Sequence, residues 1–170
     1  MKRLFTPTLI LFIFFNAAYS QVTPLWTNAQ TGTGDNSDRY NAIVMNTTGD
    51  LYLGGYTFND GHDKDYLLVK MNSSGDTLWT RQYNGADNGT DKILFMGIDG
   101  SGNIYVTGTT DGGGINQNDI LTQKYDDSGT LLWTQIYNNT NANQDDDPLG
   151  MSVDNSGNIF ITGSTDADST

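Results

Sequence analysis

The chain has 170 residues, of which 20 are acidic and 8 basic, giving a formal net charge of −12, and it contains no cysteine. The lack of cysteine excludes disulfides and a thiolate nucleophile, and the negative charge disfavours binding to nucleic acid or anionic lipid. Every acidic residue is aspartate. Because aspartate and the abundant glycine favour turns over helices, the composition predicts an all-β protein.

Residues 1–20 have the pattern of a secretory signal peptide. Lys2 and Arg3 precede an apolar run at residues 9–15, and the small residues Ala18 and Ser20 follow it. The apolar run is too short for a membrane-spanning helix. We therefore expect cleavage near Ser20 and a secreted or cell-surface protein. Secretion without disulfides favours a bacterial origin.

The rest of the chain is an internal repeat. Trp26, Trp79 and Trp133 follow one another at intervals of 53 and 54 residues, and the segments GDLYLGGYT, GNIYVTGTT and GNIFITGST start at residues 49, 102 and 157. Each copy contains short runs rich in β-branched and aromatic residues, which predict strands. Four strands at this period predict the blades of a β-propeller. A solenoid of parallel strands is the alternative.

The copies divide the chain unequally. Residues 21–37, with Trp26, match only the fourth strand of a blade, and residues 145–170 match only the first two. Residues 38–84 and 91–138 are whole four-stranded antiparallel blades. This pattern predicts a partial, open propeller. We expect either a piece of a longer protein, in which the N-terminal strand completes the last blade, or self-association that covers the open edges.

Glycine-containing segments join the first run to the second and the third to the fourth: NTTGD, DGSGN, DNSGN, NSSGD and DDSGT. Glycine after two polar residues predicts a type I turn closed by a left-handed residue. The EF-hand spacing is not met, so we interpret these segments as turns and not as metal sites. In the strand after DGSGN, the successive apolar residues 104–106 predict cover on both faces of the sheet.

Three sets of repeated residues are predicted to be structural. The tryptophans are expected to pack between blades, and replacing Trp133 by alanine is expected to cost about 3–5 kcal/mol. Glycines at 55, 108 and 163 are expected where no Cβ fits. The lysines are expected to pair with recurring aspartates of a neighbouring strand. The members of these sets are Trp26, Trp79, Trp133, Gly55, Gly108, Gly163, Lys70 and Lys124.

These motifs resemble a known family. The segment GNIYVTGTT, then Asp119, Lys124 and DDSGTLLWTQIY at residues 126–137, is similar to the SBBP repeats of bacterial β-propellers. The resemblance implies a secreted or cell-surface propeller, often part of a larger protein, and transfers no catalytic residue. The segment DxSGxxxW at residues 126–133 also resembles the tryptophan-docking motif of quinoprotein propellers, with one residue fewer between Asp and Gly. We interpret that likeness as shared hairpin geometry.

Candidate site residues lie in the loops. His62 is the only histidine, and without a GxSxG motif we expect it to be an exposed loop residue, not a triad member. Acidic loops could bind Ca²⁺, although the interpretation we prefer is solvated loops that keep the protein soluble. The weak candidates for cation ligands are Asp60, Asp63, Asp145, Asp146 and Asp147. No other cofactor is expected.

Blade connectivity places the tight turns on one face and the longer, more variable, aspartate-rich loops on the other. Variable loops on a rigid scaffold are where binding usually occurs. The sequence therefore predicts a non-enzymatic module that binds a protein or glycan. The alternative is a set of blades from a propeller enzyme, either a quinone-dependent oxidoreductase or a hydrolase, whose site lies in other sequence.

Overall fold

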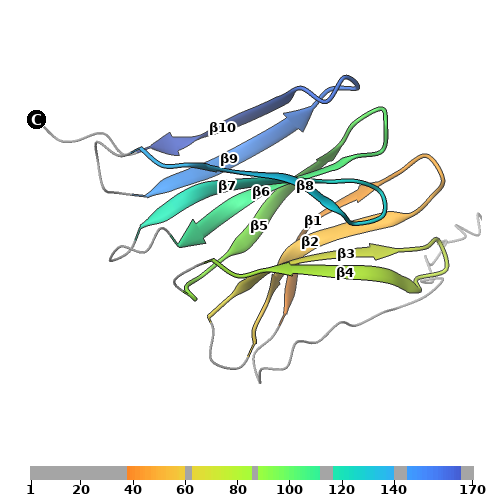
Figure 1. Cartoon of the computed structure of the whole chain (residues 1–170), viewed down its shortest axis with the longest axis horizontal. Coiled ribbons are helices and arrows are strands. Elements are labelled where there is room, and N and C mark those ends of the chain that lie inside the picture. The colour runs from red at the N-terminus through yellow and green to blue at the C-terminus, as the bar shows by residue number, and fades with distance from the viewer. Residues whose placement is uncertain (1–37, 60–62, 86–87, 112–116, 140–144, 166–170) are drawn as a thin grey trace, which may run out of the picture.

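The computed structural model describes residues 38–59, 63–85, 88–111, 117–139 and 145–165 (Figure 1). The predicted signal peptide and the predicted strand with Trp26 lie outside these residues. Within the described ranges all regular structure is β. The ten strands are β1 (Arg39–Met45), β2 (Leu51–Thr57), β3 (Asp65–Met71), β4 (Thr77–Tyr83), β5 (Lys92–Ile98), β6 (Ile104–Asp111), β7 (Asn118–Tyr125), β8 (Leu131–Tyr137), β9 (Asp146–Val153) and β10 (Ile159–Thr165).

The strands form three antiparallel sheets. The first has the order β1-β2-β3-β4, the second β5-β6-β7-β8, and the third contains only β9 and β10. The first strands of the sheets are neighbours, since β5 packs against β1 on one side and β9 on the other. This arrangement confirms the predicted blades of a partial, open propeller. It excludes the solenoid, whose strands would pair in parallel rungs.

Five tight turns confirm the predicted turn chemistry. Gly49, Gly75, Gly102, Gly129 and Gly157 have φ between 80° and 90°, a region that residues with a Cβ rarely adopt. The residue that opens each turn accepts backbone hydrogen bonds with its side chain, as Asp99 Oδ1 does from the amides of Ser101 and Asn103, both at 2.9 Å. The turns lie at one end of the strands, and the longer connections lie at the other (Figure 1).

A bulge interrupts the first strand of each sheet, and a glycine lies across from it. The register shifts between Tyr40 and Ala42 in β1 and between Ile93 and Phe95 in β5. A Cβ on Gly108 would overlap the carbonyl oxygen of Lys92. A Cβ on Gly55 or Gly163 would likewise overlap a carbonyl oxygen of the strand next to it. The glycines therefore permit the close backbone approach that the bulge creates.

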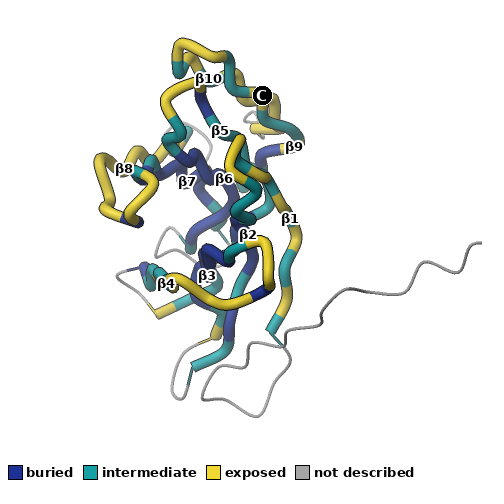
Figure 2. The backbone as a smooth tube through the Cα atoms, turned by 90° about the vertical axis from the view of Figure 1, so that its right-hand side faces the viewer, coloured by how far each residue is buried: buried dark blue, intermediate teal, exposed yellow. Residues whose placement is uncertain are grey.

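The main core lies between the first two sheets. It includes Tyr66 and Leu68 of β3, Ile104 and Val106 of β6, and Leu121 of β7. Residues 104–106 are all buried, as predicted for a strand covered on both faces. Burial falls toward β8 and β10 at the far side of the second and third sheets (Figure 2). Within the described ranges, no helix is long and apolar enough to cross a membrane.

Candidate functional site

A row of three side chains crosses the first sheet on the face toward the second. Tyr52 of β2 pairs with Lys70 of β3, and Lys70 pairs with Trp79 of β4. The register of β3 and β4 is regular up to this pair and shifts just after it, between Lys70 and Met71. The Lys70 ammonium lies 5.3 Å from the Tyr52 ring centre, and the Tyr52 and Trp79 rings are 6.0 Å apart. The row thus presents one cation flanked by two aromatic rings.

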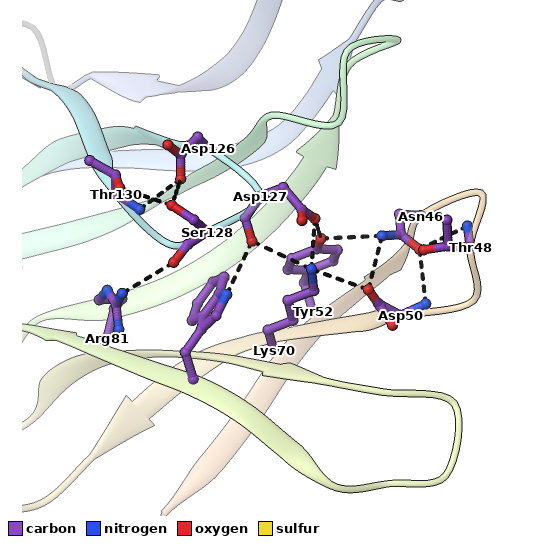
Figure 3. Close-up of polar contacts among 11 residues, drawn as sticks. Asn46, Thr48, Asp50, Tyr52, Lys70, Arg81, Asp126, Asp127, Ser128 and Thr130 are labelled. Carbon is purple, nitrogen blue, oxygen red and sulfur yellow. Dashed lines mark hydrogen bonds and ion pairs between the residues drawn. The ribbon is translucent and has the colours of Figure 1, made fainter.

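The β7–β8 turn of the second sheet docks on this row (Figure 3). Lys70 Nζ lies 2.7 Å from Asp127 Oδ1 and 3.1 Å from Asp50 Oδ2. The Tyr52 hydroxyl donates to the same Asp127 oxygen, and the Trp79 indole N–H donates to the Asp127 carbonyl at 3.1 Å. All three members of the row therefore bind one residue of the next blade.

Two further contacts fix the backbone of the same turn. Arg81 Nε donates to the Gly129 carbonyl at 2.6 Å, and Arg81 Nη2 donates to the Ser128 carbonyl at 3.3 Å. A Cβ on Gly129 would lie 3.0 Å from the Trp79 ring, and Gly129 also has a φ of 80°. Glycine is required here both by the backbone conformation and by the packing of the indole. We call Tyr52, Lys70, Trp79, Arg81 and Asp127 the blade clasp.

The charges of the clasp stabilise each other. Hydrogen bonds from Lys70 and then Tyr52 lower the pKa of Asp127. Burial opposes the charge of Lys70, but its hydrogen bonds with Asp127, Tyr52 and Asp50 outweigh burial and raise the pKa of Lys70. Burial, followed by the bond to Asp127, raises the pKa of Tyr52. A lysine held fully protonated is unsuited to act as a nucleophile or base at neutral pH. The clasp is therefore a structural contact.

The second sheet repeats the row with Tyr105, Lys124 and Trp133. Lys124 Nζ lies 4.8 Å from the Tyr105 ring centre and 3.7 Å from Asp99 Oδ2, and the Tyr105 and Trp133 rings are 6.1 Å apart. The buried Tyr105 hydroxyl donates to Asp99 Oδ2 at 3.0 Å and to the Gly157 carbonyl at 3.4 Å, whereas the Tyr52 hydroxyl of the first row donates to Asp127. The lysines pair with aspartates of the tight turns, and not with those of neighbouring strands as expected.

The expected packing of Trp133 between blades stays a prediction. Its exposed fraction is 37%, whereas Trp79 is packed against the core. The reason is that, in the part of the chain that the structure describes, the third sheet contains β9 and β10 alone and no turn of the β7–β8 type lies over Trp133. Trp26 lies outside the described residues.

Buried aspartates at the start of the second and third sheets form a second repeated contact. Asp91 accepts hydrogen bonds from the Thr110 hydroxyl at 2.5 Å and the Gly85 amide at 2.6 Å. Asp146 accepts the equivalent bond from the Asn139 amide at 2.7 Å. Burial raises the pKa of Asp91 despite these bonds. These aspartates stabilise the loops that lead from β4 into β5 and from β8 into β9.

The predicted cation ligands do not form one set. Asp63 accepts a hydrogen bond from the Thr90 hydroxyl at the first blade junction, while Asp145 accepts one from the Asn118 amide at 2.8 Å at the second. Asp146 is buried and Asp147 half-buried beside it. Asp60 and His62 lie outside the described residues. Within the ranges that the structure describes, no three acidic or histidine side chains converge as a metal site would require.

A family model described as a beta-propeller repeat, SBBP, matches residues 78–116 and 132–169. The chain belongs to the SBBP β-propeller repeat family. Each matched segment runs from the fourth strand of one sheet through the first two strands of the next, β4 to β6 and then β8 to β10. The SBBP unit therefore includes both the tryptophan and the junction that follows it. A comparison with curated proteins found no match.

Sequence reasoning missed most of the clasp. Local sequence gives Tyr52 and Arg81 no role and places Asp127 only in a tight turn. One signal was available, because a tyrosine stands three residues after the glycine of the first-to-second turn in both complete copies, at 52 and 105. The partnership between Tyr52 and Asp127 could not be found, since 75 residues separate them.

Proposed function

We propose that this SBBP protein is a secreted, non-enzymatic scaffold that binds a partner through its long-loop face, the face opposite the tight turns. The supporting observation is how its charges are divided between the two ends of the sheets. Lys70, Arg81 and Lys124 are engaged in contacts with the tight turns. Of the fifteen aspartates in the described ranges, nine lie at the long-loop end and six at the tight-turn end, and each end has three basic residues.

Five partly or fully exposed aspartates lie at the long-loop end of the described strands, against three basic residues, Arg39, Lys64 and Lys92. These aspartates are Asp38, Asp63, Asp111, Asp145 and Asp147. Lys64 lies over the rings of Tyr56 and Phe58, at 5.5 and 5.4 Å from their centres. An acidic surface attracts basic partners and speeds their association. The partner class that fits best is a protein surface rich in lysine and arginine.

The test is a titration of the mature chain with a Lys/Arg-rich peptide at low and high salt. The variant Asp63→Asn, Asp111→Asn, Asp147→Asn should weaken binding at least about tenfold at low salt. Its control is Asp76→Asn, Asp126→Asn, Asp154→Asn, which removes the same charge from the tight-turn face. Asparagine already opens the equivalent turns at Asn46 and Asn72 and closes them at Asn103 and Asn158, so the control keeps its turns. Equal weakening by both variants would show that binding depends only on the net charge of the protein, and it would refute the proposal.

Secretion is tested separately, because it depends on residues 1–20. Expression with the native N-terminus in a bacterial host should yield an exported chain that begins near Gln21. N-terminal sequencing reads the cleavage site directly. An intact Met1 on a chain retained in the cytoplasm would contradict the proposal.

A further inference from the structure

We propose that Asn88 is a site of spontaneous deamidation, a covalent modification that releases ammonia and leaves aspartate or isoaspartate at the first blade junction. The inference rests on a comparison of two identical dipeptides, Asn84-Gly85 and Asn88-Gly89, which both lie between β4 and β5. It holds whether or not the long-loop face binds a partner.

An Asn-Gly pair carries the chemistry of this reaction in its own backbone. The glycine nitrogen attacks the Cγ carbon of the asparagine and closes a succinimide ring, and Nδ2 leaves as ammonia with the proton that the glycine amide gives up. Water then opens the ring at either carbonyl, giving aspartate or isoaspartate. The attack is intramolecular and is favoured by proximity, and glycine has no Cβ to obstruct it. Asparagine is accordingly a thermolabile residue.

The structure holds the first pair closed. The Gly85 amide donates to Asp91 Oδ2 at 2.6 Å, and both residues are buried. The same carboxylate accepts a hydrogen bond from the Thr110 hydroxyl at 2.5 Å, which keeps it in place. A Cβ on Gly85 would lie 3.1 Å from Thr110 Oγ1 and 3.2 Å from Asp91 Oδ1, so the glycine has little room to turn toward Asn84. A buried hydrogen bond must therefore break before the Gly85 nitrogen can attack.

The second pair is more accessible. Asn88 is exposed and has a φ of 54°, in the left-handed region that asparagine tolerates better than most residues. Its amide donates to the Gly85 carbonyl at 3.3 Å, and its Oδ1 accepts from Asn84 Nδ2 at 2.9 Å. Gly89 is half-buried beside the Asp111 side chain. Exposed contacts of this kind open locally at a small cost in free energy, so the Gly89 nitrogen reaches its target without the unfolding of a blade.

The position of Asn88 gives the modification a structural effect. The residues that follow it make contacts of the first blade junction, since the Thr90 hydroxyl donates to Asp63 and the Asp91 amide donates to the Lys64 carbonyl at 2.6 Å. Aspartate keeps the backbone length and the Oδ1 acceptor, so these contacts should persist. Isoaspartate continues the chain through its side chain and adds one backbone carbon, which displaces the residues that follow. Both products add a negative charge to the long-loop end.

The test compares the two pairs within one molecule. The full chain is incubated in mildly alkaline buffer, either folded or unfolded in guanidinium chloride, and is then digested with trypsin. Cleavage after Arg81 and Lys92 yields one peptide, residues 82–92, that contains both asparagines. Mass spectrometry with fragmentation then assigns the conversion to Asn84 or Asn88.

We expect Asn88 to react at least about tenfold faster than Asn84 in the folded protein, a ratio that needs only a modest difference in local opening. In the unfolded chain the two rates should agree within about threefold, because the hydrogen bond from Gly85 to Asp91 is gone. Equal rates in the folded chain would overturn the proposal. An intact Asn88 in the folded chain, at a time when the unfolded sample has reacted fully, would overturn it too.

Two variants test what keeps the first pair closed. Asp91→Ala removes the acceptor of the Gly85 amide, and the milder Thr110→Val removes the hydrogen bond that holds this acceptor. Each should speed the reaction of Asn84 at least about fivefold, with circular dichroism as the check on folding. An unchanged rate at Asn84 in a folded variant would contradict the role of Asp91.

The structural effect is tested on the products. Asn88→Asp reproduces the aspartate form, and its thermal midpoint should lie within about 1 °C of the native value. The isoaspartate form, separated by ion exchange from the incubated protein, should melt several degrees lower because it displaces the junction contacts. An isoaspartate form that melts together with the native chain would contradict this effect.

Discussion

At the scale of single residues, Asp127 shows how one turn position connects two blades. Its carboxylate faces Lys70, whose side chain is only 6% exposed, while the Asp127 side chain is 60% exposed. Solvent therefore screens part of the attraction. We expect Asp127→Asn to destabilise the protein by about 1 kcal/mol at pH 7. Urea unfolding measures the change, with Asp76→Asn as the control because Asp76 belongs to the equivalent turn of the first sheet.

The same contact predicts a pH dependence. Because the folded state lowers the pKa of Asp127, its contribution is present above the unfolded pKa of about 4 and is lost as pH falls through the folded value. Stability of the native sequence should therefore decline more steeply below pH 4 than that of Asp127→Asn. Parallel pH profiles of the two proteins would contradict this assignment.

Gly108 makes a different prediction at the residue scale. A Cβ there would overlap the Lys92 carbonyl across the bulge, and both backbones belong to a buried sheet. Gly108→Ala should cost about 3 kcal/mol, because the β5–β6 pair must separate. Thermal unfolding measures it. Gly102→Ala is the matched control, since nothing lies within 4 Å of its Cβ position and only its left-handed φ of 84° opposes the change. A loss of stability no larger than that of Gly102→Ala would contradict the predicted overlap with the Lys92 carbonyl.

At the scale of elements, β4 and β8 are the equivalent fourth strands of their sheets, in two different environments. Trp79 packs on the core and donates to the Asp127 carbonyl, whereas Trp133 remains 37% exposed. Trp79→Ala should destabilise by about 3–5 kcal/mol and Trp133→Ala by about 2 kcal/mol, because less contact is lost. Denaturant unfolding of both variants measures the difference. Equal losses would show that Trp133 is covered in solution.

At the scale of the whole molecule, we expect Ca²⁺ to add nothing to the stability of the propeller. The predicted ligands belong to two separate blade junctions, and no triad converges in the described ranges. We therefore expect the melting temperature to be the same within about 1 °C in millimolar Ca²⁺ and in chelator. A rise of several degrees with Ca²⁺ would instead point to ligands such as Asp60, outside the described residues.

The sequence alone determined the blades and the turn glycines, because these depend on local patterns. Strand-length apolar runs and a left-handed residue at a fixed turn position are readable within a few residues. The tertiary structure decided which side chains meet across blades. Asp127 and Tyr52 are far apart in the sequence. Trp79 and Trp133 lie in sequence segments that are nearly identical. Only the stacking of one sheet on the next determines that Trp79 is covered and Trp133 is open, because burial depends on what the neighbouring blade supplies.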